Sequence, residues 1–237
     1  MEYNLDQFKK GLSDLNINLT EKQIEQFLIY FEILVETNKV MNLTAITEFD
    51  EVIEKHFLDS LSLVRVFDLN RNVKILDLGT GAGFPGIPLK IAFPEIDIVL
   101  ADSLNKRVKF LNEVVETLQL KQVETVHGRA EELAKNKKYR EQFDLCTSRA
   151  VANLSSLSEY CIPFVKEGGR FISYKSGEIE EEVDQAKRAI HVLGGKLDQV
   201  YKFDLHEQKR SFVIIEKVKK TPAVYPRKAG TPTKEPL

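Results

Sequence analysis

The first 70 residues carry apolar side chains at the spacing of amphipathic helices. Thr20 opens the order T-E-K-Q, which matches a capping box and predicts the start of a helix. The apolar stripe that follows contains Ile24, Phe27, Leu28, Phe31, Leu34 and Val35. A second stripe begins near Thr47 and contains Val52, Ile53, Phe57, Leu61 and Val64, and a weaker one runs over 5–15. These stripes predict an N-terminal helical extension over residues 1–70.

After Asn72 the pattern changes to short apolar runs separated by helical stripes, the order typical of a parallel sheet flanked by helices. The expected strands are 73–78, 96–101, 122–126, 143–147 and 168–174. The expected helices lie near 86–92, 104–118, 130–138, 153–165 and 178–193. Together they predict an α/β fold.

The last two apolar runs, 197–205 and 211–218, predict an antiparallel hairpin on this otherwise parallel sheet. The connection HEQKR between them leaves no room for a crossover helix. The tail that follows holds four prolines and no periodicity, which predicts an extended arm. The predicted organisation is therefore a helical extension over 1–70, an α/β domain of seven strands over 71–218 and a basic arm over 219–237.

Composition narrows the class of protein. The chain has 237 residues, 43% of them hydrophobic, and no apolar run near the roughly 18 residues of a membrane span. Its N-terminus lacks the order of a signal peptide, so we expect a cytoplasmic protein without a membrane anchor. Cys146 and Cys161 have no metal-ligand spacing, and we expect buried thiols, no bound metal and a monomer. The net charge of −2 hides a basic end, because residues 216–237 hold six Lys or Arg against two Glu.

The stretch ILDLGTGAGFPG, at 75–86, is the main candidate for a binding site. Its glycines Gly81, Gly83 and Gly86 have the G-x-G-x-x-G spacing of a strand that turns into a helix. Such a turn is expected to present free backbone N–H groups and the positive end of a helix dipole to a ligand. The spacing alone is a weak signal, because glycine turns also serve tight packing and positive φ.

Two carboxylates make the loop more specific. Asp102 ends the next expected strand, where a carboxylate can accept hydrogen bonds from both hydroxyls of a ribose. Asp77 precedes the loop and would repel a pyrophosphate, whereas it would attract the ammonium and sulfonium of S-adenosylmethionine. Ala130 and Glu131 open a later helix at the place where such folds meet an adenine. The ribose position by itself fits a nicotinamide dinucleotide equally well.

Several segments together resemble a known family. ILDLGTGAG with Asp102 resembles the Rossmann-like class I methyltransferases, which implies a seven-stranded, mostly parallel sheet with an antiparallel last strand. Nearly the whole chain resembles the family of ribosomal RNA small-subunit methyltransferase G, also called glucose-inhibited division protein B. The segments that carry this resemblance are NKVMNLTAI (38–46), EKHFLDSL (54–61), LGTGAGFPGIPLKIAFP (78–94), SRAV (148–151) and YPRKAGTP (225–232).

The resemblance implies S-adenosylmethionine as methyl donor, 16S rRNA or the small ribosomal subunit as partner, and N7 of one guanosine as the methylated atom. Carried onto matching positions, it places cofactor contacts at Gly79, Phe84, Asp102, Ser103, Leu104, Ala130, Glu131 and Arg149. The residues of the glycine loop itself add Asp77, Gly81 and Gly83 to the predicted cofactor site.

The residues present also fit this chemistry. The fourth strand lacks the (N/D)PP(Y/F) loop of amino methyltransferases, and neither cysteine has the Pro-Cys or Thr-Cys context of a C5 nucleophile. Guanine N7 is already a lone-pair nucleophile exposed in the major groove, so alignment can replace a general base. We therefore assign no catalytic residue. His56 lies on an apolar stripe, where a core histidine is favoured over a catalytic one.

Substrate contacts are expected from cations. We predict Arg149, after the fourth strand, together with Lys175, Arg227 and Lys228. The acidic residues of the N-terminal extension make it a poor surface for RNA. Three alternatives stay open: a small-molecule methyltransferase on the same scaffold, a nicotinamide-dependent oxidoreductase, and a ribosome-assembly factor that keeps a cofactor for stability.

Overall fold

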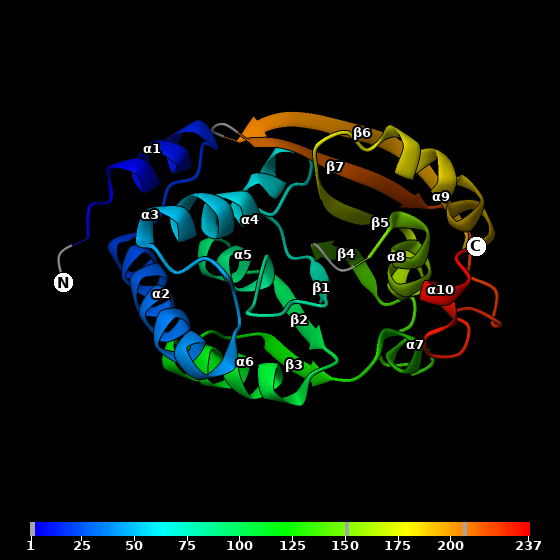
Figure 1. Ribbon diagram of the computed structural model, residues 1–237, viewed down its shortest axis with the longest axis horizontal. Helices are drawn as coiled ribbons and strands as arrows, with labels where there is room; N and C mark the ends of the chain where they lie inside the picture. The colour runs from blue at the N-terminus through cyan, green and yellow to red at the C-terminus, as the bar shows by residue number, and fades with distance from the viewer. Residues whose placement is uncertain (1–2, 150–151, 206–207) are drawn as a thin grey trace.

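A seven-stranded sheet forms the centre of the computed structural model, which describes residues 3–149, 152–205 and 208–237 (Figure 1). The strand order is β3-β2-β1-β4-β5-β7-β6, with β7 antiparallel to both of its neighbours and the other pairs parallel. This confirms the predicted mostly parallel sheet with an antiparallel last strand. The strands are β1 (Lys74–Leu78), β2 (Asp97–Asp102), β3 (Val123–His127), β4 (Phe143–Arg149), β5 (Val165–Ser176), β6 (Gly195–Leu205) and β7 (Gln208–Lys217).

Two parts of the sequence predictions fall outside the described residues. The connection between β6 and β7 contains residues 206–207, and the segment SRAV ends at 150–151. The hairpin itself is confirmed by the antiparallel pairing of β6 with β7 from Leu205 and Gln208 onward.

Each strand of the sheet places alternate side chains on opposite faces. In β1, Ile75 packs into the hydrophobic cluster that contains the N-terminal helices, whereas Leu76 packs into the cluster on the other face. The helices between the strands are α5 (Gly86–Ala92), α6 (Asn105–Thr117), α7 (Ala130–Leu133), α8 (Leu154–Cys161) and α9 (Glu180–Val192). The N-terminal helices lie on one side of the sheet, and α8 and α9 lie on the other (Figure 1).

Helix α7 is much shorter than predicted. The sequence predicts a helix to residue 138, but α7 ends at Leu133. The side chain of Asn136 accepts a hydrogen bond from the backbone N–H of Lys138 at 2.9 Å, and Arg140 donates to the carbonyl of Ala134 at 3.1 Å. Because these bonds replace helical ones, the chain turns here instead of continuing as a helix.

The N-terminal segment folds directly onto the sheet. Its helices α1 (Asp6–Asp14) and α2 (Glu21–Met41) confirm the predicted stripes, and Thr20 forms the complete capping box with Gln23. A third helical segment contains α3 (Phe49–Val52), a π-helical turn η1 (Ile53–Leu58), α4 (Asp59–Leu61) and the 3-10 turn η2 (Ser62–Arg65). All of it shares one hydrophobic cluster with β1 and β2, so the division at residue 70 stays a prediction.

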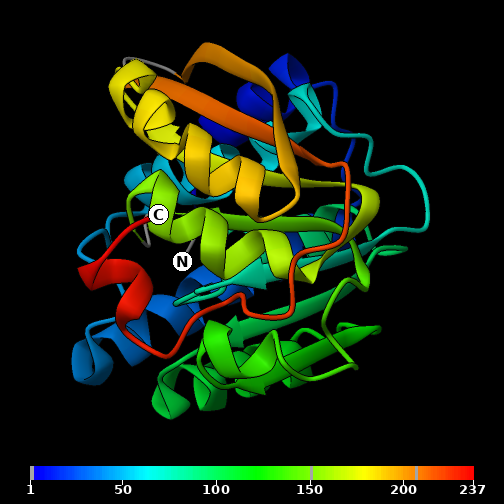
Figure 2. The same ribbon diagram turned by 90° about the vertical axis from the view of Figure 1, so that its right-hand side faces the viewer.

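The tail is anchored to the molecule, which corrects the prediction of an extended arm. It contains a short helix, α10 (Thr231–Lys234), which lies beside α8 (Figures 1 and 2). Arg227 forms an ion pair at 2.7 Å with Glu159 of α8, whose side chain is fully buried. Ser156, also in α8, donates a hydrogen bond to the carbonyl of Pro232 at 2.7 Å. These partners are far apart in sequence, so the local composition of the tail did not reveal them.

Within the described residues, none of the helices combines the length and the apolar character that crossing a membrane requires.

Candidate functional site

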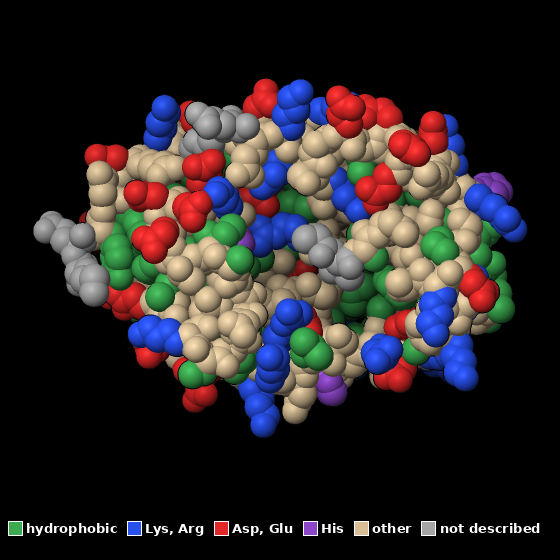
Figure 3. All heavy atoms as spheres, viewed as in Figure 1, with side chains coloured by type: hydrophobic (Ala, Val, Ile, Leu, Met, Phe, Trp, Pro, Cys, Tyr) green, Lys and Arg blue, Asp and Glu red, His purple; other side chains and the backbone are tan. Residues whose placement is uncertain are grey.

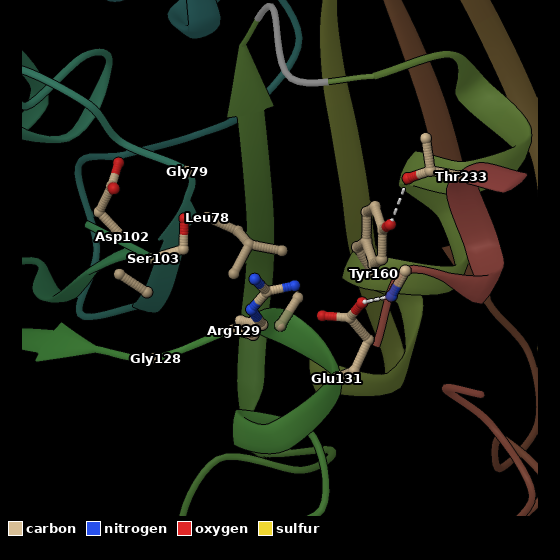
Figure 4. A pocket seen from close by; sticks show the side chains of 12 residues that line it. Leu78, Gly79, Asp102, Ser103, Gly128, Arg129, Glu131, Tyr160 and Thr233 are labelled. Carbon is tan, nitrogen blue, oxygen red and sulfur yellow. Dashed lines mark hydrogen bonds between the residues drawn. The ribbon is translucent and has the colours of Figure 1, made fainter. Parts of the chain in front are cut away.

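A pocket of about 300 Å³ opens at the carboxyl ends of β1 and β2 (Figure 4). This edge of an open α/β sheet is where ligands of such folds bind. Five of the predicted cofactor residues line it: Gly79, Asp102, Ser103, Ala130 and Glu131. The other lining residues were not predicted from the sequence; they are Leu78, Ala101, Gly128, Arg129, Tyr160, Gly230 and Thr233.

The glycine loop does not offer its N–H groups to a ligand as predicted. The N–H of Gly79 donates to the carbonyl of Ala101 at 2.8 Å, and that of Gly83 donates to the carbonyl of Thr80 at 2.9 Å. The N–H of Gly81 donates to the carboxylate of Asp102 at 3.0 Å. A pyrophosphate would find these three donors already used, which disfavours the dinucleotide interpretation.

The glycines instead permit the shape of the loop. Gly83 has φ +102°, and a Cβ there would approach the hydroxyl of Tyr30 to 2.8 Å. That hydroxyl donates a hydrogen bond to the carbonyl of Ala82, so helix α2 supports the loop directly. A side chain at Gly83 would therefore displace the loop from the helix that holds it.

Asp77 supports the loop from below and is not among the residues that line this pocket, so its predicted contact with the ligand stays a prediction. The side chain is fully buried, and Oδ2 accepts hydrogen bonds from Thr80 Oγ1 at 2.6 Å and from the N–H of Gly86 at 2.8 Å. Burial raises the pKa of Asp77 to about 6. Because Asp77 occupies the first N–H of α5, the helix end that a pyrophosphate would use is already capped.

Asp102 is the best placed ligand-binding carboxylate. Its side chain lines the pocket and is almost fully buried. Oδ1 accepts a hydrogen bond from the N–H of Leu104 at 2.9 Å, and Arg107 lies 3.4 Å from Oδ2. Oδ2 also accepts the hydrogen bond from the N–H of Gly81 at 3.0 Å. A carboxylate has about four acceptor positions, so one is free and a second is taken only by the long contact with Arg107, which a ribose hydroxyl can replace. Leu104 itself is 43% exposed and contributes to the site by orienting Asp102.

The far wall of the pocket is built by the tail. Glu131 accepts a hydrogen bond from the N–H of Gly230 at 3.0 Å, and Thr233 lies 2.7 Å from the hydroxyl of Tyr160 (Figure 4). Gly230 thus brings the tail against the start of α7, and Thr233 brings it against α8. The segment YPRKAGTP carried the signal for this wall, but its composition suggested an RNA-binding arm.

A second pocket of about 540 Å³ lies next to the end of β4. It is lined by Ile46, Lys55, His56, Asp59, Arg149, Tyr174, Lys175, Ser176, Glu182, Gln208 and Arg210. The hollow at the centre of the face in Figure 3 has Lys and Arg side chains on its walls. The predicted substrate residues Arg149 and Lys175 both belong to this second pocket.

Phe84 joins the glycine loop to the second pocket. Its buried ring stacks on His56 with centroids 4.5 Å apart, and the guanidinium of Arg149 lies 5.1 Å from its centroid. Of the cofactor residues predicted here, Arg149 lines the second pocket and Phe84 packs against it, and neither lines the first pocket.

His56 is an uncharged member of this second pocket. Burial and the positive charge of Arg149 lower its pKa to about 4. Its Nε2 lies 2.8 Å from Thr44 Oγ1, and its Nδ1 lies 3.3 Å from Arg149 Nη2. Through these two contacts, His56 connects the loop before α3 with β4. The core position predicted for it therefore also has a structural role.

His56 is expected to make folding stability depend on pH. Its pKa falls from 6.5 in the unfolded chain to about 4 in the folded one, so stability is full above pH about 6.5 and is lost as the pH falls towards 4. The shift corresponds to about 3 kcal/mol at 1.36 kcal/mol per unit. Urea unfolding at several pH values should show that His56→Gln removes this loss. The exposed His191, changed to Gln, should leave it intact; a slope in the His56 variant equal to that of the wild type would contradict the assignment.

Two of the cations predicted to bind RNA, Lys175 and Arg227, form ion pairs with carboxylates of the protein. Lys175 Nζ lies 2.5 Å from Glu182, and Arg227 donates to both carboxylate oxygens of Glu159. Arg227 thus anchors the tail, and its predicted phosphate contact has no support in this geometry. Lys228 is exposed and stays a candidate. Within 3–149, 152–205 and 208–237, no group of three or more His, Cys, Asp or Glu is placed to hold a metal ion.

Comparison with known proteins identifies the family. The family model GidB, described as rRNA small subunit methyltransferase G, matches residues 23–213. The chain belongs to this family. The protein named ribosomal RNA small subunit methyltransferase G in Lachnoclostridium phytofermentans is 53% identical over 232 residues, which cover 97% of this chain and 96% of the relative. Its namesake in an Exiguobacterium species is 50% identical over 99% of both chains.

Solved structures support the same fold. A SAM-dependent methyltransferase from Aquifex aeolicus superposes with a TM-score of 0.52 and 19% identity, covering 70% of this chain and 92% of the other. TrmN from Thermus thermophilus gives a TM-score of 0.53 and 16% identity, covering 70% of this chain and 53% of the other. The predicted Rossmann-like methyltransferase fold is therefore confirmed.

Family membership also confirms small-subunit rRNA methylation with S-adenosylmethionine as the donor. The donor set of the first pocket fits this cofactor. Asp102 offers a carboxylate to ribose hydroxyls, and the cavity volume is in the range of small-molecule sites. Ala130 and Glu131, which the sequence predicts beside the adenine, line the same pocket, and the occupied N–H groups of the loop suit a ligand without phosphates.

Proposed function

We propose that this methyltransferase transfers a methyl group to N7 of one guanosine in 16S rRNA. The acceptor base would enter the second pocket, beside Arg149, while the donor occupies the first. We also propose that the protein works in the cytoplasm as a monomer.

One observation carries the choice of N7. In the second pocket, as far as the structure describes its lining, the carboxylates of Asp59 and Glu182 are engaged by cations, and His56 is neutral with a pKa of about 4. The carboxylates are held in ion pairs, and an imidazole with a pKa of about 4 is a weak base, so none of these groups suits the removal of a proton from an exocyclic amine. N7 carries no proton, so methylation needs only the alignment of its lone pair with the methyl group.

The reaction also conserves charge within the site. The positive charge of a sulfonium disappears as the methylated guanine becomes a cation, so no new charge needs a counter-ion. This agrees with a pocket wall whose carboxylates are already neutralised by Arg149, Lys175 and Arg210.

The decisive experiment uses small ribosomal subunits from a strain that lacks this enzyme. They are incubated with the protein and S-adenosylmethionine, and the RNA is then treated with borohydride and aniline, which cleave at N7-methylguanosine. A new single cleavage in 16S rRNA is expected. Incorporation of labelled methyl without cleavage would move the reaction to another atom.

The same assay addresses the alternatives. Transfer to a metabolite pool and none to rRNA would support a small-molecule methyltransferase, and single-turnover transfer excludes a purely structural assembly factor. A nicotinamide cofactor is disfavoured because the loop N–H groups and the first N–H of α5 are engaged within the protein. Thermal protection by NADH and none by S-adenosylhomocysteine would contradict this conclusion.

A further inference from the structure

Three strands of the sheet hold the third N-terminal helical segment at one place. Arg149 from β4 reaches Asp59 Oδ2 at 2.7 Å, and Arg210 from β7 reaches Asp59 Oδ1 at 2.8 Å. Between them, Tyr174 of β5 donates a hydrogen bond to the carbonyl of Ser60 at 2.8 Å. One carboxylate therefore joins guanidinium groups from two strands that are separated by β5.

The π-helical turn contributes to this arrangement. It widens the helix at 53–58 and leaves the carbonyl of Lys55 to accept a hydrogen bond from Arg149 Nη1 at 3.2 Å. Arg149 is thereby fixed by a carboxylate, by a carbonyl and by its contact with Phe84. Its side chain is only 16% exposed, so it has little freedom to search for a substrate.

Arg210 is held differently from Arg149. Its Nε donates to Asp59, and its Nη2 donates to Gln208 at 2.6 Å. Nη1 has no acceptor among the described residues, and Arg210 lines the second pocket. The ion pair thus fixes one edge of the guanidinium while the other edge stays available to a ligand.

The charges of the pocket explain what Asp59 does. The lining has four cations, Lys55, Arg149, Lys175 and Arg210, and two carboxylates, Asp59 and Glu182. Lys55 forms an ion pair with Glu51 outside the lining, which leaves three cations opposed by two carboxylates. One positive charge remains, which suits one anionic phosphate group of RNA. Without Asp59, the two guanidinium groups would lose their common acceptor and would repel each other.

We propose that Asp59 is a positioning residue of the methyl transfer, which acts through Arg149 and Arg210 to fix the acceptor nucleotide beside the donor pocket. This inference rests on the proposed placement of the acceptor in the second pocket. It assigns a role in substrate placement to the N-terminal segment, whose acidic composition argues against RNA binding. The Asp59 carboxylate is almost fully buried, so it works through the two arginines.

The test is a double-mutant cycle with methyl transfer to small subunits as its readout. Asp59→Asn keeps the shape of the side chain and removes its charge, so we expect kcat/KM to fall about 100-fold, with the affinity for S-adenosylhomocysteine unchanged. Because the variant gains one positive charge, its affinity for non-specific RNA should stay equal or rise. Asp50→Asn, an exposed position on the same helical segment, should behave as wild type.

Coupling distinguishes positioning from general damage. The double variant D59N/R210Q should lose clearly less than the sum of the two single losses, because the carboxylate acts in part through this arginine. Additive losses, or a parallel loss of cofactor affinity, would overturn the proposal. Methyl incorporation is counted regardless of the atom methylated, so a failure of the N7 assignment is separate from a failure of this inference.

A second variant keeps the test valid should Asp59→Asn not fold. Arg210→Lys preserves the charge, but an ammonium group lacks the planar fork of a guanidinium. It cannot hold Asp59 with one edge and present a second edge to the substrate. It should be as impaired as Arg210→Gln. Wild-type kcat/KM in Arg210→Lys would overturn the proposal.

Discussion

Replacing Arg227 by Ala is expected to destabilise the protein by about 3–5 kcal/mol, because it leaves the charge of Glu159 buried and unpaired. Glu159 is fully buried and accepts hydrogen bonds from the backbone N–H, Nε and Nη2 of Arg227. Thermal unfolding should show a decrease in Tm of roughly 6–20 °C, given about 2–4 °C per kcal/mol for a chain of this size.

The same variant should also bind the cofactor more weakly. Arg227 anchors the segment that brings Gly230 against Glu131 and Thr233 against Tyr160, so its loss frees one wall of the first pocket. Calorimetry with S-adenosylhomocysteine should show an affinity lower by about tenfold or more, the equivalent of one lost hydrogen bond.

Lys228 is the matched control for Arg227. It is the next residue, it is exposed, and Lys228→Ala should change neither Tm nor cofactor affinity. Should it weaken the binding of small subunits, the predicted RNA contact of the tail would belong to this residue. An unchanged Tm in the Arg227 variant would contradict the anchoring role.

The strands could be predicted because their signal is local. Alternating burial places Ile75 and Leu76 on opposite faces of the sheet. Most strand ends were predicted to within about two residues. The π-helical turn at 53–58 could not be predicted, because the apolar stripe of a helix is the same with or without it. Its carbonyl partner, Arg149, lies 94 residues away from Lys55.

The candidate site was predicted by residue type more reliably than by orientation. Asp102 was placed correctly in the pocket, since its position at the end of a strand fixes it at the edge of the sheet. Asp77 also ends a strand region, but its carboxylate turns inward because the N–H of Gly86 and the hydroxyl of Thr80 are its nearest donors. A sequence pattern contains no information on this choice of rotamer.

The preference for a cofactor without phosphates now depends on a different observation. From the sequence, this preference was expected because Asp77 would repel a pyrophosphate. In the structure Asp77 is fully buried beneath the loop, and the preference follows from the occupied N–H groups of Gly79, Gly81 and Gly83. Of the two strand-end carboxylates, Asp102 is the one that lines the pocket.

Asp102→Ala is accordingly expected to lower the affinity for S-adenosylmethionine by at least 100-fold. Hydrogen bonds to a charged group contribute about 1.5–3 kcal/mol each, and two ribose hydroxyls would lose theirs. Part of the loss is indirect, because Asp102 also orients the N–H groups of Gly81 and Leu104. Calorimetry with S-adenosylhomocysteine measures the total effect.

Asp102→Asn separates the direct loss of hydrogen bonds to the ribose from the indirect loss of support for Gly81 and Leu104. The amide keeps one oxygen for Gly81 or Leu104 but loses the charge and half of the acceptor capacity, so its affinity should lie between those of wild type and Asp102→Ala. Asp97→Asn, at the opposite end of β2, should bind as wild type does. Retained affinity in Asp102→Ala, with Tm preserved, would mean that the ribose is recognised elsewhere and that the first pocket serves another part of the ligand.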